Sequence, residues 1–417
     1  MKVLSQPRMA RDVLRAILIG TIIGLTIGVL VILSLKSDFI QQKITSLHYR
    51  ILEALPQPNV PQFVPTSLPI ATPTATETPL PITQLSSNPT ATWTPRPTRA
   101  PTHPPNASVK AIQPSVKLRS IKQDYQRWNN CGPATLGMTL QYFDKTDTQA
   151  QIAAFTKPNA DDRNVSPTEL AAYADSIGLN SLIRVNGTID RLKLILSNGL
   201  PVLVETGFVK QPQGWMGHYR LLVGYDSKHF HLMDSYDGPN VNLSFDDLDH
   251  EWRAFNRLYL VIYSDQQAAL VRSMLGDTLD DQAMYAQAAV RAREEIADDP
   301  KDGFAQFNLG SSLTGMKRYA DAAAAFDQAR ALNLPWRMMW YQFDPYVAYL
   351  QVGRNDEVIA LANSLLRSAD DLEESHYYKG LALRAMGRST EARAEFQATL
   401  KWNKNYKDAQ KALANSK

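Results

Sequence analysis

The chain has 417 residues, which is too long for one ordinary globular core, so two or three domains are expected. Its 44 basic and 41 acidic side chains give a net charge of +3, and this balance favours neither a nucleic-acid partner nor a strongly acidic one. The single cysteine, Cys131, excludes an intrachain disulfide framework and the common Cys-rich zinc sites.

The N-terminal segment predicts a membrane anchor. Residues 16–35 form an uncharged apolar run that is long enough to cross a lipid bilayer as a single helix. The residues after Leu35 make a poor cleavage site, so residues 1–36 are expected to stay attached. Basic residues flank the run on both sides, with a slight bias toward a cytoplasmic N-terminus. We therefore expect a single-pass cell-membrane protein whose later domains are extracytoplasmic.

Small residues recur along this predicted span. Ala16, Gly20, Gly24 and Gly28 are spaced by four positions and form one stripe on a helix. Such stripes let two membrane helices approach closely, which predicts a homodimer. The alternative is that glycine is simply common in membrane helices.

Two segments without a globular pattern follow the anchor. Residues 37–54 predict a short amphipathic helix. Residues 55–107 are rich in Pro, Thr, Ala and Ser and hold more than half of the chain's 25 prolines. Such a composition buries too little apolar surface to fold, so we expect a disordered stalk of extended polyproline character.

Residues 108–264 predict an α+β domain. Helical patterns come first, at 131–143, 167–176 (after a capping box at Ser166–Glu169) and 188–197. Strand-like patterns then cover 201–205, 218–225, 229–234 and 258–264, with a short helix at 244–252 before the last of them. Helices followed by strands predict an antiparallel sheet packed on helices.

Residues 270–417 predict an all-α array of tetratricopeptide repeats. Small and aromatic residues fall at the signature positions of such a repeat twice over. They are Leu309, Gly310, Ala322 and Phe326, and then Gly380, Ala392 and Phe396. The spacing of Gly353 and Gly387 matches the 34-residue period of the repeat. Three or four helical hairpins are expected, with a concave groove of the kind that holds a peptide or a protein partner.

Cys131 is the first candidate for chemistry. It precedes apolar residues at helical spacing, so it lies at or near a helix N-terminus, where the helix dipole favours a thiolate. A thiolate is a competent nucleophile when an imidazole lies beside it. The alternative is a buried structural cysteine.

The base would be one of the five histidines that follow Cys131 in the chain. Four have ordinary explanations in a repeat helix, a polar helix or an exposed strand face: His376, His250, His229 and His231. His218 follows a Gly-Trp-Met-Gly loop and opens an apolar strand, a place from which an imidazole can point into a cleft.

Asp234 is the candidate that would orient this imidazole. It ends the next predicted strand, and in a hairpin the end of one strand lies beside the start of the other. A carboxylate there fixes the imidazole tautomer and stabilises its charged form. The alternative is that Asp234 caps a turn with Ser235 and Gly238, and Asp237 is its local competitor.

Three separated motifs resemble the papain-fold peptidases related to bacteriocin-processing (double-glycine) peptidases. They are residues 126–134, 217–226 and 232–235, in the order that the family shows. The resemblance covers about residues 117–264 and implies that Cys131 is the nucleophile, His218 the base and Asp234 the orienting carboxylate. It also implies that Gln126 helps to stabilise the oxyanion.

Two positions depart from the family pattern. Ser235 stands where the family usually has proline, and Gln126 lies five residues before the cysteine where some members have six. The resemblance implies a papain-like cysteine peptidase of the bacterial cell envelope that needs no metal and no organic cofactor. The alternatives are an acyl transferase or amidase with the same triad, and a binding scaffold without activity.

Overall fold

The computed structural model describes residues 62–69, 108–210 and 214–415. The predicted span 16–35 with its small-residue stripe, the amphipathic segment 37–54 and most of the predicted stalk lie outside these residues. Among the helices that are described, none is long and apolar enough to cross a membrane.

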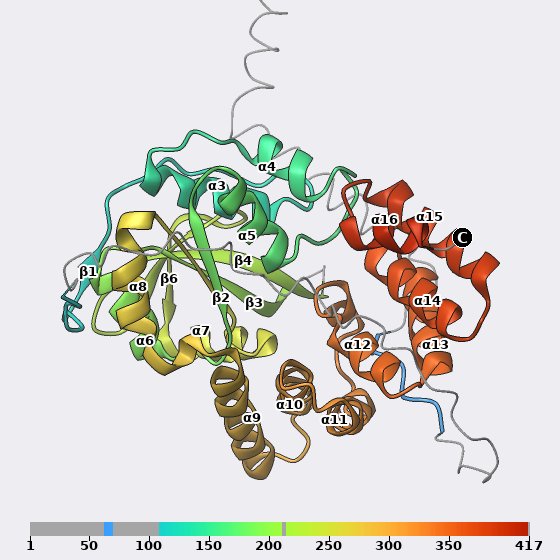
Figure 1. Cartoon of the computed structure of the whole chain (residues 1–417). Coiled ribbons are helices and arrows are strands. Elements are labelled where there is room, and N and C mark those ends of the chain that lie inside the picture. The colour runs from blue at the N-terminus through green and yellow to red at the C-terminus, as the bar shows by residue number, and fades with distance from the viewer. Residues whose placement is uncertain (1–61, 70–107, 211–213, 416–417) are drawn as a thin grey trace, which may run out of the picture. The chain divides into compact units, whose positions relative to one another are not determined.

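A seven-stranded sheet forms the centre of the first described domain (Figure 1). Its main path runs β2–β7–β3–β4–β5–β6, with β1 paired to β4, and each of these pairs is antiparallel. The strands are β1 Val116–Lys117, β2 Asn180–Arg184, β3 Val202–Lys210, β4 Gly214–Tyr225, β5 His229–Asp234, β6 Gly238–Ser244 and β7 Tyr259–Tyr263. The predicted antiparallel sheet is therefore confirmed.

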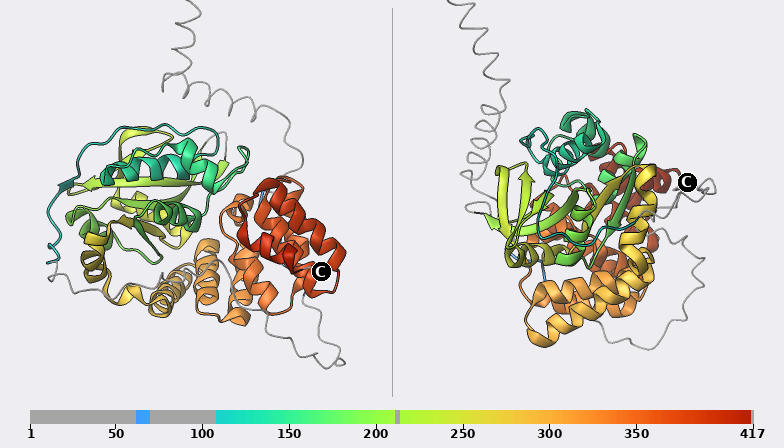
Figure 2. Two further views of the ribbon diagram at one scale, coloured as in Figure 1. Left: turned by 45° about the horizontal axis from the view of Figure 1, so that its top comes forward. Right: turned by 90° about the vertical axis from the view of Figure 1, so that its left-hand side faces the viewer.

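Helices cover both faces of this sheet (Figure 2). They are α3 Cys131–Leu140, α4 Gln149–Thr156, α5 Pro167–Ser176, α6 Ile189–Ser197, α7 Phe245–Trp252 and α8 Ala268–Leu275. Alternation along β3 separates two cores: Leu203 packs with α3 and α5, whereas Val202 and Val204 pack with α6, α7 and α8. The sheet is buried on both sides, which keeps its central strands rigid enough to carry a site.

The predicted helix starts have the capping chemistry that the sequence indicated. Ser166 Oγ accepts a hydrogen bond from Glu169 N, and Glu169 Oε2 accepts one from Ser166 N, which completes the capping box of α5. Thr188 caps α6 with one bond, in which its side chain accepts from Arg191 N. These caps explain why both helices begin where the sequence predicted.

Strand β4 begins earlier than predicted. Gly214 to Gly217 were expected to form a loop, but they pair with Lys210 to Gly207 on β3. His218 is therefore an interior residue of a long strand and does not open it. Tertiary pairing overrides the weak strand propensity of glycine here. Strands β1, β2 and β6 and helix α4 were not predicted.

The second helical region consists of paired helices. They are α9 Asp281–Asp298, α10 Gly303–Gly315, α11 Tyr319–Ala331, α12 Asp344–Gln351, α13 Asn355–Leu366, α14 Glu373–Ala385, α15 Ser389–Trp402 and α16 Lys407–Ala414. A Cβ on Gly310 would lie 2.5 Å from Phe326, and one on Gly380 would lie 2.6 Å from Phe396. In both helical hairpins an aromatic ring of the second helix packs against a glycine of the first, as the repeat pattern predicts.

A short 3₁₀ helix, η5 (Trp336–Trp340), interrupts the array between α11 and α12. Residues 62–69 pack against the chain just before it, where Val64 N donates to Leu334 O at 2.9 Å. Val64 is only 2% exposed and belongs to the core of the repeat region. Within the stretch that was expected to bury too little apolar surface to fold, residues 62–69 therefore place one apolar side chain in this core.

Candidate active site

Cys131 is the first residue of α3, at the point where the chain leaves a tight turn. Asn129 in this turn has a φ of 51°, in the left-handed region that asparagine tolerates. The buried ammonium of Lys157 donates hydrogen bonds to Asn129 O at 3.2 Å and to Asp162 O at 2.5 Å. The turn before the thiol is therefore fixed, and the partly buried cysteine faces the free N–H end of the helix.

His218 lies on β4 directly opposite Thr206 of β3. Its Nε2 is 2.9 Å from Asp234 Oδ1, and both side chains are almost fully buried. The rings of Phe208 and Tyr236 pack edge-on against the imidazole at centroid distances of 5.9 and 6.4 Å. The structure thus brings together the histidine and the aspartate that the sequence singled out, and it encloses them with aromatic rings.

Asp234 ends β5 and accepts several hydrogen bonds. Oδ1 also accepts from the backbone N–H groups of Tyr236 at 2.7 Å and Asp237 at 3.0 Å, while Oδ2 accepts from Arg220 Nε at 3.0 Å. Both predicted contacts of Asp234 are therefore present: its carboxylate caps the turn and also binds His218. Arg220 extends the network through an ion pair with Glu251.

These contacts set the charge of the carboxylate. Burial by itself would raise the pKa of Asp234. The charge and hydrogen bond of His218, followed by the charge of Arg220, outweigh burial and hold this pKa well below its usual range. Asp234 is therefore ionised at neutral pH and can stabilise an imidazolium.

The thiol and the imidazole shift each other's pKa in opposite directions. Burial alone would raise the pKa of the Cys131 thiol, but a hydrogen bond from His218 and its charge lower it. Burial alone would lower the pKa of His218, but Asp234 and then Cys131 raise it to about 9. Because Nε2 already faces Asp234, the other ring nitrogen, Nδ1, serves the thiol. Both shifts favour the thiolate and imidazolium form of the pair.

Gln126 lies on the segment before α3 and contacts Ser235, the residue that follows Asp234. Its backbone N–H donates to Ser235 O at 2.8 Å, and its Oε1 accepts from Ser235 Oγ at 3.0 Å. These two bonds fix the orientation of the Gln126 side-chain amide, with Oε1 toward Ser235. Its donor group, Nε2, therefore lies on the opposite side of the amide. Ser235, which departs from the family pattern and directly follows Asp234, thus holds the side chain and backbone of Gln126.

Several residues of the site were missed in the sequence. Arg220 lies two positions after His218, so strand periodicity puts both on one face, and this was the available signal. Nothing in the sequence around Phe208 and Tyr236 indicated a place in the site, because their contacts with His218 depend on strand pairing. The buried Glu205 lies opposite Tyr219 in the sheet, and burial followed by the charge of the Cys131 thiol raises its pKa well above the ordinary range.

The other histidines considered as the base, and Asp237 as the alternative carboxylate, lie elsewhere or contact other residues. His229 and His231 face Asp226, and His376 lies 2.6 Å from Glu395 in the repeat region. Asp237 forms a half-exposed ion pair with Lys210 at 2.5 Å. His250 is exposed on α7. None of these side chains joins the hydrogen-bonded group around His218.

An aromatic side chain of the second helical region lies next to this site. Tyr341, just after η5, lies against Gly217, where an added Cβ would be 3.1 Å from its ring. Trp215 packs edge-on against Tyr341 at 6.1 Å and stacks on Phe255 at 6.0 Å. The strand residue next to His218 is therefore bounded by a residue of the second helical region.

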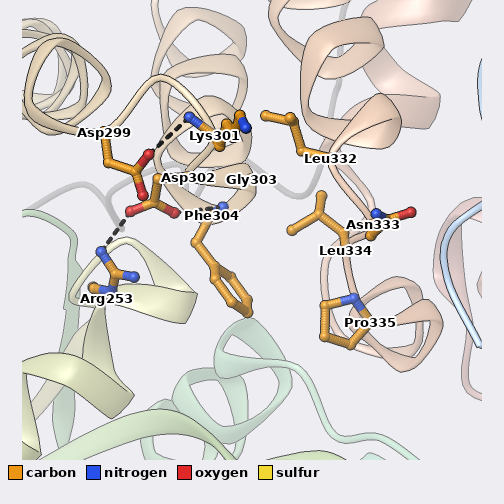
Figure 3. Close-up of a pocket in the computed structure, with 10 residues that line it drawn as sticks. All are labelled: Arg253, Asp299, Lys301, Asp302, Gly303, Phe304, Leu332, Asn333, Leu334 and Pro335. Atoms are coloured by element: carbon orange, nitrogen blue, oxygen red, sulfur yellow. Dashed lines mark hydrogen bonds and ion pairs between the residues drawn. The ribbon is translucent and has the colours of Figure 1, made fainter.

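A separate pocket of about 260 Å³ lies between η2 (Arg253–Phe255) and the start of the repeats (Figure 3). Arg253 and Asp302 form an ion pair of 2.5 Å in its wall, and Phe304, Leu334 and Pro335 supply its apolar side. Neither Cys131 nor the residues around it line this pocket. It is therefore not the place where the thiol would act.

Comparison with known proteins agrees with this organisation. The profile of the Peptidase_C39 like family matches residues 114–260. Protein O-mannosyl-transferase Tmtc3 of Drosophila melanogaster is 27% identical over 134 residues, which are 31% of this chain and only 14% of that protein.

Three solved structures are similar to parts of the chain at low identity. A putative C39-like peptidase from Bacillus anthracis is 17% identical, with 36% of this chain and 98% of that chain covered and a TM-score of 0.31. A double glycine motif protease in complex with its leader peptide is 17% identical, with 36% and 99% covered and a TM-score of 0.28. The tetratricopeptide protein YrrB, with an unusual peptide-binding site, is 13% identical, with 35% and 71% covered and a TM-score of 0.29.

Proposed function

The chain joins a domain related to the C39-like, bacteriocin-processing peptidases to tetratricopeptide repeats, and we propose that it is a thiol-dependent peptidase. Cys131 is the nucleophile, His218 the base and Asp234 the carboxylate that orients it. The observation that carries this proposal is the buried hydrogen-bonded series of thiol, imidazole and carboxylate.

The chemistry follows from these groups. The Cys131 thiolate attacks the carbonyl carbon of the substrate, and an S–C bond forms as the carbonyl electrons move onto oxygen. The Cys131 N–H and the Gln126 amide would donate to this oxyanion. The imidazolium of His218 then protonates the leaving amine as the C–N bond breaks. Water, deprotonated by His218, hydrolyses the thioester and restores the thiol.

We also propose a place and a partner for this activity. The apolar run 16–35 would hold the chain in the lipid bilayer of the cell membrane, with the stripe Ala16, Gly20, Gly24 and Gly28 available for a homodimer. Residues after the run would then be extracytoplasmic. A peptide or protein is the substrate class, and a peptide or protein is also the partner class that suits the repeats.

Alkylation of the thiol tests the proposal directly. Cys131 is the chain's single cysteine, so iodoacetamide labelling followed by mass spectrometry reports on it alone. We expect it to alkylate at pH 7 at least tenfold faster than free cysteine, because its thiolate fraction is larger. His218→Ala should remove this advantage, whereas His231→Ala, at a half-buried position of β5 that faces Asp226, should keep it. Equal rates in the wild type and His218→Ala would remove His218 from the role of base.

A further inference from the structure

Residues 62–69, with the sequence Gln-Phe-Val-Pro-Thr-Ser-Leu-Pro, lie extended across the repeat helices and are blue in Figure 1. Their first part pairs with the backbone before η5. Val64 N donates to Leu334 O at 2.9 Å, and Trp336 N donates to Gln62 O at 3.3 Å. This is a short antiparallel bridge, centred on Phe63 and Pro335, between segments some 270 positions apart in the sequence.

A buried cation recognises the middle of the segment. Arg330 on α11 is only 2% exposed, yet its Nε donates to Pro65 O at 2.7 Å and its Nη2 donates to Thr66 O at 3.3 Å. Nη1 of the same guanidinium pairs with Glu357 Oε1 at 2.7 Å. A buried arginine is costly unless its donors are satisfied, and here two of them are directed at consecutive backbone carbonyls.

Two carboxylates recognise the end of the segment. Ser67 Oγ donates to Asp327 Oδ1 at 2.5 Å, and Leu68 N donates to Glu357 Oε2 at 2.8 Å. Arg354 bridges both acceptors, at 2.6 Å from Asp327 and 3.1 Å from Glu357. The acceptors are thus held in position by residues of the repeats themselves.

The sequence of the segment suits these contacts. Pro65 lacks an N–H group, and the N–H groups that are bound belong to Val64 and Leu68. Proline also fixes φ near the extended conformation, so little backbone entropy is lost on binding. Val64 is 2% exposed, whereas Phe63 and Leu68 remain 46% and 43% exposed. Recognition therefore rests on the backbone, one small apolar side chain and one hydroxyl.

We propose that this surface of α11, α13 and the chain before η5 is a peptide-binding site for extended segments of the type Val-Pro-x-Ser, and that residues 62–69 are its resident ligand in cis. The chain that leads from the N-terminus is thereby tied to the repeats. A tethered ligand acts at an effective concentration of roughly 1 mM. A free peptide of equal intrinsic affinity, supplied at ~10 μM, would then occupy about 1% of the sites.

Competition with a free peptide tests this assignment. A fluorescent peptide of residues 60–71 is titrated into the full chain and into a full chain whose residues 62–69 are replaced by Gly and Ser. We expect the replaced chain to bind this peptide and the wild-type chain to bind it at least tenfold more weakly, because its site is filled. Changes are best made in the peptide, since they leave the protein fold untouched. Val64→Asp and Ser67→Ala in the peptide should each weaken binding at least fivefold, and Phe63→Ala should change it less than twofold.

Hydrogen exchange on the unmodified chain gives an independent measurement. The amides of Val64 and Leu68 should exchange at least tenfold more slowly in the wild type than in the full chain carrying Val64→Asp. No binding to the replaced chain, binding of equal strength to both chains, or unprotected amides in the wild type would each overturn the proposal. A replaced chain that fails to fold would leave the hydrogen exchange result to decide.

Discussion

Replacing the carboxylate of Asp234 by an amide removes charge from the site with little change of shape. In Asp234→Asn the Oδ1 atom can still accept from the turn and from His218. The amide Nδ2, however, would take the place of Oδ2, which now accepts a hydrogen bond from Arg220 Nε at 3.0 Å. Two N–H donors would then face each other. If the amide turns over instead, Nδ2 faces His218 and favours the wrong imidazole tautomer.

The expected loss of activity in Asp234→Asn follows from the pKa of the His218 imidazole. Asp234 is the main cause that raises the pKa of His218 to about 9 from its ordinary value of 6.5. This difference corresponds to about 3 kcal/mol of preference for the imidazolium, at 1.36 kcal/mol per pKa unit. The thiolate–imidazolium pair weakens accordingly, and we expect kcat/KM on a peptide library to fall about a hundredfold.

The assay compares Asp234→Asn with Asp237→Asn, three residues away. Turnover and the alkylation rate of Cys131 are both divided by the folded fraction from near-UV circular dichroism, because the buried Arg220 loses one of its two carboxylate partners and stability falls as well. Asp237 has only a half-exposed ion pair with Lys210, of the kind that contributes less than about 1 kcal/mol, so Asp237→Asn should keep wild-type turnover. Full turnover per folded molecule in Asp234→Asn, or its loss in Asp237→Asn, would refute the reasoning.

Three further predictions concern the neighbours of this carboxylate, the pH profile and the repeats. Ser235→Ala removes the hydroxyl that holds the Gln126 amide, so kcat should fall roughly threefold to tenfold with KM unchanged, less than the 10²–10³ expected for loss of a whole oxyanion donor. Turnover should rise with pH as the thiol ionises below its ordinary pKa of 9.0 and fall again near pH 9 as His218 loses its proton, while alkylation of the thiolate should not fall there. Gly310→Ala places a Cβ 2.5 Å from Phe326 and should lower the free energy of unfolding by about 1–3 kcal/mol, measured by urea denaturation.

Sequence alone determined the features that depend on local chemistry. The capping box at Ser166 gave the start of α5, because its hydrogen bonds join residues three positions apart. The Gly310 pattern gave the repeats, since one hairpin contains both the glycine and the aromatic ring that fills its space. Cys131 at the start of α3 followed from helical periodicity in the same way.

Tertiary structure decided the features that join distant residues. His218 and Asp234 could be proposed as partners from hairpin geometry, but the ion pair of Arg220 with Asp234 and the packing of Phe208 on His218 became visible only through the register of β3, β4 and β5. That register depends on the burial of both sheet faces, which no single strand sequence specifies.

The segment 62–69 shows the same limit most clearly. Its composition predicts an extended chain without helix, and residues 62–69 contain no helix and form one isolated bridge. Whether such a chain is solvated or packed depends on a binding surface that lies hundreds of residues later. Arg330 and Glu357 supply that surface, and neither carries a local signal that would identify its partner. Composition gave the conformation of this segment, and the repeat fold alone decided where it lies, because its contacts are long-range.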